Sequence, residues 1–108
     1  MKPTVCVDFD GVLNNYTHYD ENDLSTPRHG AKEFLEALNK KYKVVILTAR
    51  RFDKVSKWLA EHDLLGYVHD VTNIKPPAVA YIDDRAIPFM GDYEDTLRTL
   101  SIFEPYWK

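Results

Sequence analysis

The spacing of hydrophobic and polar positions changes along the chain, and it predicts four β-strands. Residues 4–9 (TVCVDF) are β-branched and apolar up to Asp8, which is typical of a buried parallel strand that opens into a loop. Residues 44–47 (VVIL) are four consecutive apolar residues, and residues 79–82 (VAYI) lead into a pair of aspartates. A weaker strand is expected at residues 67–71.

Segments with the hydrophobic periodicity of a helix lie between these strands. Apolar residues recur at three- and four-residue spacing over residues 31–42 and again from residue 52 to a closing glycine at residue 66. A last helix is expected within residues 93–100, and residues 102–103 are expected to add an edge strand. Strands that alternate with helices predict a three-layer Rossmann-like α/β fold, with a parallel sheet, right-handed crossovers and helices on both faces.

The remaining long segment, residues 11–29, has no regular periodicity. Asn, Tyr, Asp and Ser dominate it, so we expect a loop with at most a small hairpin. Thr26 and Pro27 favour the start of a helix there, because threonine caps helices and proline suits the first turn.

Composition fits one globular domain spanning residues 1–108. The chain has 44% hydrophobic and 29% charged residues, enough apolar content for one packed core. A net charge of −3 argues against a broad nucleic-acid surface, which is usually basic. No apolar run approaches the roughly 18 to 20 residues that span a bilayer, so we expect a cytoplasmic protein without membrane partners. Cys6 is the only cysteine and is expected to be a buried hydrophobe.

Polar side chains follow three of the predicted strands. Asp8 and Asp10 come after the first strand, Thr48 follows the second, and residues 83–84 (DD) end the fourth, which Lys75 precedes. The carboxyl ends of parallel strands meet at one edge of the sheet, so we expect these side chains to share one site.

Together these groups suit phosphoryl transfer, which needs a carboxylate nucleophile, an acid/base, oxygen ligands for a hard cation, and phosphate-binding donors. Mg²⁺ prefers oxygen ligands, so Asp8, Asp83 and Asp84 are candidate ligands. Gly11 permits a tight turn whose backbone N–H groups face an anion. Taken singly, strand-end aspartates and loop lysines are usually turn or solvated residues; their joint order carries the prediction.

Four short motifs resemble those of the haloacid dehalogenase (HAD) superfamily. Residues 8–12 (DFDGV) resemble its first motif, DxDG[TV], which is the most specific of the four. Thr48 in VVILT resembles the second motif, Lys75 in NIKPP the third, and residues 83–84 in YIDD the fourth. The resemblance extends over residues 5–84, most of the chain.

The resemblance implies a phosphatase that works through an aspartyl-phosphate intermediate. Asp8 would attack phosphorus, and Asp10 would protonate the leaving oxygen and then activate water, which requires a raised proton affinity. Thr48 and Lys75 would bind phosphoryl oxygens. The expected substrate-binding residues are Gly11, Thr48, Ala49, Arg50 and Lys75. The expected Mg²⁺ ligands are Asp8, the Asp10 backbone carbonyl, Asp83 and Asp84.

Two features depart from the usual HAD pattern. Only seven residues separate Lys75 from Asp83, and Pro76–Pro77 favour extended backbone, so the lysine must reach the site from a short loop. Only residues 12–29 are available to cover the substrate, so we expect no cap domain. Substrate choice would then depend on that loop, which carries Asn14, Asn15, Tyr16, His18 and Tyr19.

Several readings compete. A response-regulator receiver domain uses similar groups but in another order. A non-catalytic HAD-like domain that binds phosphate or a partner is disfavoured because both Asp8 and Asp10 are present. Within the enzyme class, we expect a phosphorylated small molecule as substrate, and the alternative is a 3′-phosphatase acting on nucleic-acid ends. The aromatic C-terminal region would either close the core or form a subunit contact; it comprises Phe89, Phe103, Tyr106 and Trp107.

Overall fold

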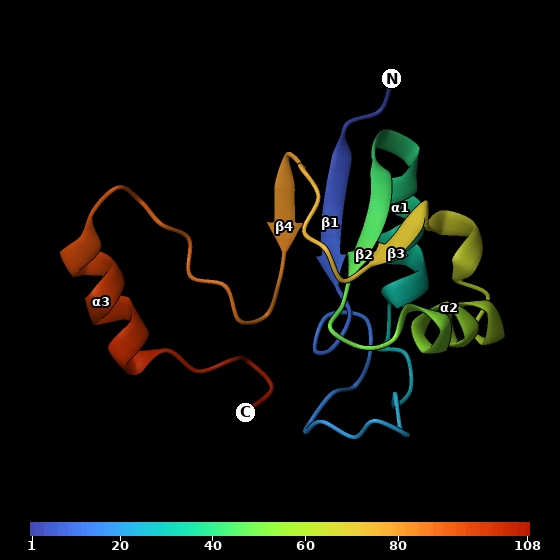
Figure 1. The fold of residues 1–108 in the computed structure, drawn as a ribbon, viewed down its shortest axis with the longest axis horizontal. Coiled ribbons are helices and arrows are strands. Elements are labelled where there is room, and N and C mark those ends of the chain that lie inside the picture. The colour runs from blue at the N-terminus through green and yellow to red at the C-terminus, as the bar shows by residue number, and fades with distance from the viewer.

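Four short strands form one parallel sheet in the order β3-β2-β1-β4 (Figure 1). The computed structural model describes residues 1–108. The strands are β1 (Thr4–Asp8), β2 (Lys43–Leu47), β3 (Asp70–Thr72) and β4 (Ala80–Ile82). Strand β1 pairs with β2 over its whole length and with β4 through Val5, Cys6 and Val7. Rossmann-like parallel α/β architecture is thereby confirmed.

Two helices and a 3₁₀ turn cover one face of this sheet. They are α1 (Ala31–Lys41), α2 (Phe52–Glu61) and the turn Leu65–Tyr67. Alternate residues of β1 and β2 point into this layer, as strand geometry requires. The buried core comprises Val5, Val7, Phe9, Leu13, Ala31, Leu35, Val44, Ile46, Val55, Trp58, Leu59 and Leu64.

The opposite face carries no packed helix. Cys6, Val45 and Tyr81 occupy neighbouring positions on it, because Cys6 pairs with both of the others in the strand register. The segment between β3 and β4 passes over this face, where the Tyr81 hydroxyl donates to the Pro76 carbonyl at 2.6 Å (Figure 1). A pair of prolines explains why the crossover is extended rather than helical.

The third helix, α3 (Tyr93–Ile102), stands away from the sheet beyond β4 (Figure 1). The chain has a radius of gyration of 14.6 Å, against about 13 Å for a compact chain of this length. The prediction of an edge strand at residues 102–103 is wrong, because Ile102 ends α3 far from any strand that could pair with it. The second helical layer expected from the sequence is therefore not assembled on this chain's own sheet.

Element boundaries differ from the sequence prediction in three places. The first helix begins after Gly30, and Pro27 instead forms an isolated bridge with Asn14, so the predicted cap at Thr26–Pro27 is wrong. The helix expected to continue to Gly66 ends at Glu61, and Asp63 adopts a positive φ of 59°. β3 begins at Asp70, three residues later than expected. The helices are all short, and none has the length and apolar content needed to cross a membrane.

Candidate active site

Three aspartates meet at the carboxyl edge of the sheet. Val7 pairs with Ile82 in the β1–β4 ladder, so the residues that follow them, Asp8 and Asp83, end neighbouring strands. Asp84 joins them, and one carboxylate oxygen from each of the three lies within 4.8 Å of the others. The sequence prediction that these residues share one site is consistent with this placement.

Asp84 has one oxygen satisfied and one without a donor. Its Oδ2 accepts a hydrogen bond from the Trp107 indole N–H, while its Oδ1 is buried and has no hydrogen-bond partner. Buried acceptors without partners are rare in folded proteins and usually indicate an ion or a functional role. A hard divalent cation would satisfy this oxygen together with those of Asp8 and Asp83, so the cluster fits Mg²⁺ in donor type and spacing.

The carboxyl group of Asp8 is electrostatically unfavourable in its charged form. Burial, the close approach of the Asp84 carboxyl, and the charges of Asp83 and Asp84 together raise the pKa of Asp8 to about 8, against a partial opposing effect of the Phe9 backbone N–H. The neighbouring carboxylates disfavour a negative charge on Asp8 and favour its protonated form. A bound cation would replace that proton and leave Asp8 charged and nucleophilic.

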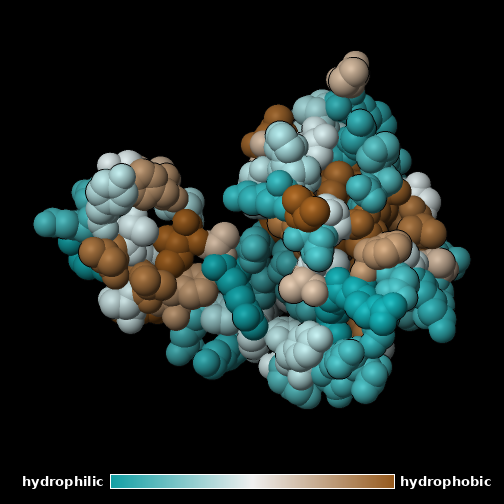
Figure 2. Space-filling model, in the orientation of Figure 1, coloured by the Kyte–Doolittle hydropathy of each residue, from teal (hydrophilic) through white to brown (hydrophobic).

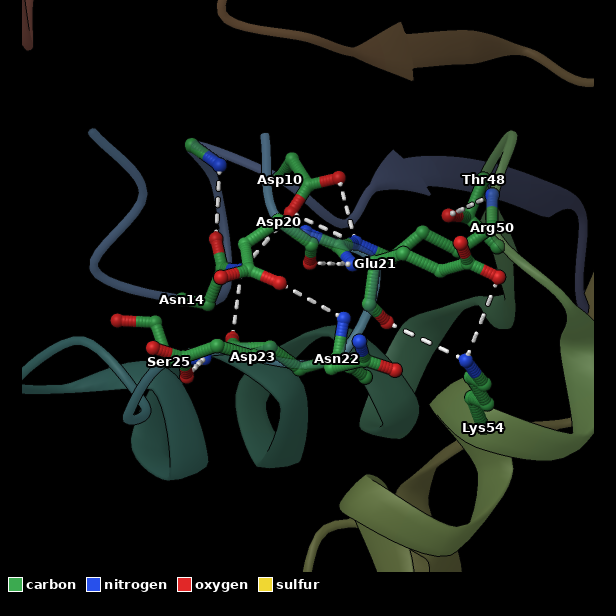
Figure 3. A network of polar contacts seen from close by, with 12 residues as sticks. Asp10, Asn14, Asp20, Glu21, Asn22, Asp23, Ser25, Thr48, Arg50 and Lys54 are labelled. Atoms are coloured by element: carbon green, nitrogen blue, oxygen red, sulfur yellow. Dashed lines mark hydrogen bonds and ion pairs between the residues drawn. The ribbon is translucent and has the colours of Figure 1, made fainter. Parts of the chain in front are cut away.

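Asp10 lies in a separate polar network, shown in Figure 3. Both of its carboxylate oxygens accept from Arg50 Nε, at 3.1 and 2.9 Å, and Oδ1 also accepts from the Asn14 side-chain amide at 2.9 Å. Its side chain is directed to Arg50 rather than to the three-aspartate cluster. The network holds Asp10 in one orientation two residues after Asp8.

Arg50 has a different surrounding from the one expected. Its side chain is only 3% exposed, its Nη1 donates to the Asp20 carbonyl at 2.8 Å, and Tyr19 stacks on its guanidinium at 4.8 Å. We expected Arg50 to clamp an anionic group of the substrate; the structure places it as the partner of Asp10. Its Nη2 is buried and unpartnered, so it is free to donate to an additional acceptor.

Asn14 is a site residue whose role the sequence did not indicate. It is fully buried, its carbonyl oxygen accepts from the Gly11 N–H, and its amide donates to both Asp10 and the Leu24 carbonyl. We expected this asparagine on a substrate-covering loop. It instead fastens that loop to the first motif. The Gly11 N–H is consequently engaged within the protein and does not face an open anion site.

Thr48 follows β2 at the same edge of the sheet. Its side chain is buried, and its hydroxyl oxygen accepts from the Arg50 N–H at 3.1 Å, which leaves the hydroxyl hydrogen free to donate. Ala49 is exposed and lines a cavity of about 490 Å³ with Arg51, Thr72 and Asn73, beside the ends of β2 and β3. Both residues therefore lie at the carboxyl end of β2.

Lys75 is not joined to the aspartates. Its ammonium lies over the Tyr81 ring, 4.4 Å from the centroid, on the sheet face opposite α1 and α2. No hydrogen bond or ion pair links it to Asp8. The short, proline-rich crossover between β3 and β4 carries Lys75 over the sheet but leaves its ammonium on the Tyr81 ring.

The C-terminal residues return to the site and cover it. In addition to the Trp107–Asp84 bond, the Tyr106 hydroxyl donates to the Gly11 carbonyl at 2.5 Å. Trp107 packs edge-on against Tyr16, and the Arg85 guanidinium lies over the Trp107 ring at 5.0 Å. Gly11 has a φ of 84°, and a Cβ there would collide with Asp84 and Trp107. The aromatic C-terminus thus closes over the site, a role that differs from both of those expected from the sequence.

Beside this cover, a shallow pocket opens over the aspartates. Its volume is about 350 Å³, and it is lined by Gly11, Val12, Arg28, Ile82, Asp83, Asp84 and Tyr106. The Arg28 guanidinium stacks on Tyr106 at 5.0 Å from the ring centroid. The pocket is therefore lined by one positively charged side chain, Arg28, and by two carboxylates, those of Asp83 and Asp84.

Comparison with known proteins gives a fold and no function. No protein-family model and no curated protein matches the chain. A solved structure of a conserved protein from Bacteroides thetaiotaomicron is similar, with a TM-score of 0.65 and 19% sequence identity. The similarity covers 94% of this chain and 91% of that one. At this identity the likeness supports the α/β fold alone.

Proposed function

We propose that the protein is a magnesium-dependent phosphomonoester hydrolase in which Asp8 is the nucleophile. The observation that carries the proposal is the cluster of Asp8, Asp83 and Asp84, which holds a buried carboxylate oxygen without a donor. The resemblance to HAD motifs implies these roles for the same residues and supports the proposal.

Asp8, Asp83 and Asp84 would hold the ion, and the Asp10 backbone carbonyl is the further ligand that the motif resemblance implies. Bound Mg²⁺ would neutralise the repulsion between these carboxylates and a phosphate dianion. The nucleophile and the acid/base are side chains of the protein itself, Asp8 and Asp10.

The first step joins an Asp8 carboxylate oxygen to phosphorus while the phosphorus–oxygen ester bond breaks. The departing alkoxide takes a proton from the Asp10 carboxyl. Water then attacks the phosphorus of the aspartyl phosphate and gives a proton back to Asp10, which releases inorganic phosphate and restores Asp8.

Two structural contacts bear on these steps. The ion pair of Asp10 with Arg50 must loosen for Asp10 to turn toward the leaving oxygen, so Arg50 is a positioning residue for the acid/base. Thr48 has a free hydroxyl hydrogen for a phosphoryl oxygen. Lys75 would reach the phosphate by leaving the Tyr81 ring, which its exposed side chain permits.

The substrate class is a small phosphate ester, such as a sugar phosphate or a nucleotide. The net charge of −3 disfavours long nucleic-acid partners. One observation supports the second candidate, a phosphatase for 3′-phosphorylated nucleic-acid ends: Tyr16, Trp107 and Arg85 form an aromatic and cationic surface beside Asp84. Bases stack on such surfaces without sequence preference.

A phosphatase screen tests the proposal. Phosphosugars, nucleotides and 3′-phosphorylated oligonucleotides are offered to the wild-type protein with Mg²⁺ or with EDTA, and phosphate release is measured. The Asp8→Asn variant should lose at least about 10³-fold in rate, because the nucleophile is gone. Asp70→Asn is the matched control, since Asp70 lies at the start of β3, at the other edge of the sheet.

Rapid acid quench followed by mass spectrometry should also detect phosphate on Asp8 during turnover. Activity that survives Asp8→Asn or EDTA would overturn the mechanism, and an absence of activity on all three substrate classes would favour the non-catalytic reading. Oligonucleotide binding that weakens with salt would select the second candidate substrate.

A further inference from the structure

Helix α3 has an apolar stripe that no part of its own chain covers. Tyr93, Leu97 and Leu100 recur at helical spacing on one side, and they are 78%, 66% and 59% exposed. Phe89 extends the stripe by stacking on Tyr93, with ring centroids 5.1 Å apart. Figure 2 shows hydrophobic side chains gathered on this lobe, which stands apart from the sheet domain.

The sheet face opposite α1 and α2 is also incompletely covered. Val79 and Tyr81 lie two residues apart on this face and are 65% and 39% exposed. Ile74, at the start of the crossover that passes over the face, is 75% exposed. In α/β folds of this kind, helices cover both faces of a parallel sheet. The chain therefore has an unpaired helix and a sheet face that lacks one.

The charges around the two surfaces are complementary. The first turn of α3 carries Glu94 and Asp95, next to its apolar stripe. Lys75 stands on the open sheet face, above Tyr81. A helix packed with Leu97 on Tyr81 would bring opposite charges together at one end of the contact.

The course of the chain keeps α3 apart from its own sheet. The arm (residues 85–106), which contains α3, leaves the sheet domain after Asp84 and returns to it at Trp107. Asp84 and Trp107 are hydrogen-bonded to each other. Both ends of the arm are thus fixed at the same place, with α3 projecting between them (Figure 1). Only 18 of 108 residues are buried, which leaves a small core for a chain of this length.

We propose that two copies of the chain exchange α3, so that the Tyr93–Leu97–Leu100 stripe of each packs on the Val79–Tyr81 sheet face of the other. The occupant is a second copy because one chain supplies both surfaces, and a two-fold pairing satisfies both at once. Each sheet then has helices on both faces.

Sedimentation equilibrium on the wild-type chain should give the mass of two chains. Leu97→Lys places a charge in the centre of the stripe, and since the contact occurs twice, the dissociation constant should rise at least about 100-fold. Thr99→Lys adds the same charge outside the stripe and should leave the dimer intact. Circular dichroism of both variants confirms that they fold. A monomeric wild type, or equal effects of the two substitutions, overturns the proposal.

Carbodiimide cross-linking of a refolded equal mixture of light and ¹⁵N-labelled chains tests the exchange itself. About half of the peptides that join Lys75 to Glu94 or Asp95 should contain one light and one heavy half, because the link forms between chains that pair at random. Exclusively same-label links would show that α3 folds back on its own sheet, and a dimer without any Lys75–α3 link would place the contact elsewhere; either result overturns the exchange.

Discussion

The raised pKa of Asp8 links the chemistry of a single residue to the stability of the whole fold. An aspartate whose folded-state pKa of about 8 exceeds its ordinary value of 3.8 favours folding only while it is protonated. In metal-free protein, that contribution is complete below about pH 4 and is lost as the pH rises to about 8.

Asp8→Asn should remove this pH dependence. In EDTA at about pH 9, the variant should exceed the wild type in free energy of unfolding by roughly 1–3 kcal/mol, a range that allows for solvent screening. Near pH 4 the difference should nearly vanish. Urea unfolding at both pH values measures it, and excess Mg²⁺ should narrow the gap at high pH by stabilising the wild type alone. A constant difference across pH would show that Asp8 titrates normally.

Arg50 and Arg51 are adjacent arginines, and one is buried while the other is exposed, so the costs of substituting them can be compared directly. Arg50→Lys loses the fork that holds Asp10 and the Asp20 carbonyl, so it should lower the free energy of unfolding by about 2–4 kcal/mol and reduce turnover. Arg51→Lys changes only an ion pair with Asp53. Because the Arg51 side chain is 72% exposed, this substitution should lower the free energy of unfolding by under about 0.5 kcal/mol. Chemical denaturation of both variants checks the ranking. Equal costs would mean that the Asp10–Arg50 pair does not organise the site.

Among the elements, the C-terminal segment acts on the three-aspartate cluster through one hydrogen bond. The Trp107 N–H donates to Asp84 Oδ2 and orients the carboxylate, while Oδ1 stays buried without a donor. Outer hydrogen-bond partners commonly orient metal-binding carboxylates in this way.

Trp107→Phe keeps an aromatic ring beside Tyr16 but removes the donor. We expect Mg²⁺ affinity to fall about 10-fold by isothermal titration calorimetry, because Asp84 becomes free to rotate. Tyr16→Phe retains the edge-on contact, has no bond to Asp84 and should leave the affinity unchanged. Tighter Mg²⁺ binding by Trp107→Phe would instead show that the tryptophan blocks the site.

The elements also show where sequence patterns are informative. β1, β2, α1 and the strand-end aspartates are predictable because local periodicity fixes each strand and parallel pairing brings the ends together. The partner of Arg50 lies 40 residues away and that of Tyr106 lies 95 residues away, and no spacing rule specifies such contacts. The resting position of Lys75 was equally unpredictable, since it depends on how two prolines direct a short crossover over Tyr81.

At the scale of the whole molecule, an exchanged helix makes folding depend on protein concentration. Dimer formation stabilises the native state by mass action, so the thermal midpoint should rise by a few degrees for each tenfold increase in concentration. Thr99→Lys should keep this dependence and Leu97→Lys should lose it. Differential scanning calorimetry at three concentrations measures the slope, and a flat wild-type response would contradict a linked dimer.

The two ends of the chain differ in what can be attached to them. The N-terminus precedes β1 at the edge of the sheet away from the aspartates, whereas Trp107 touches Asp84 one residue before the last position. An affinity tag or fluorescent fusion on the C-terminal side would disturb the residues that cover the site, and a histidine tag there would bring competing metal ligands next to it. Purification and labelling should therefore use the N-terminus.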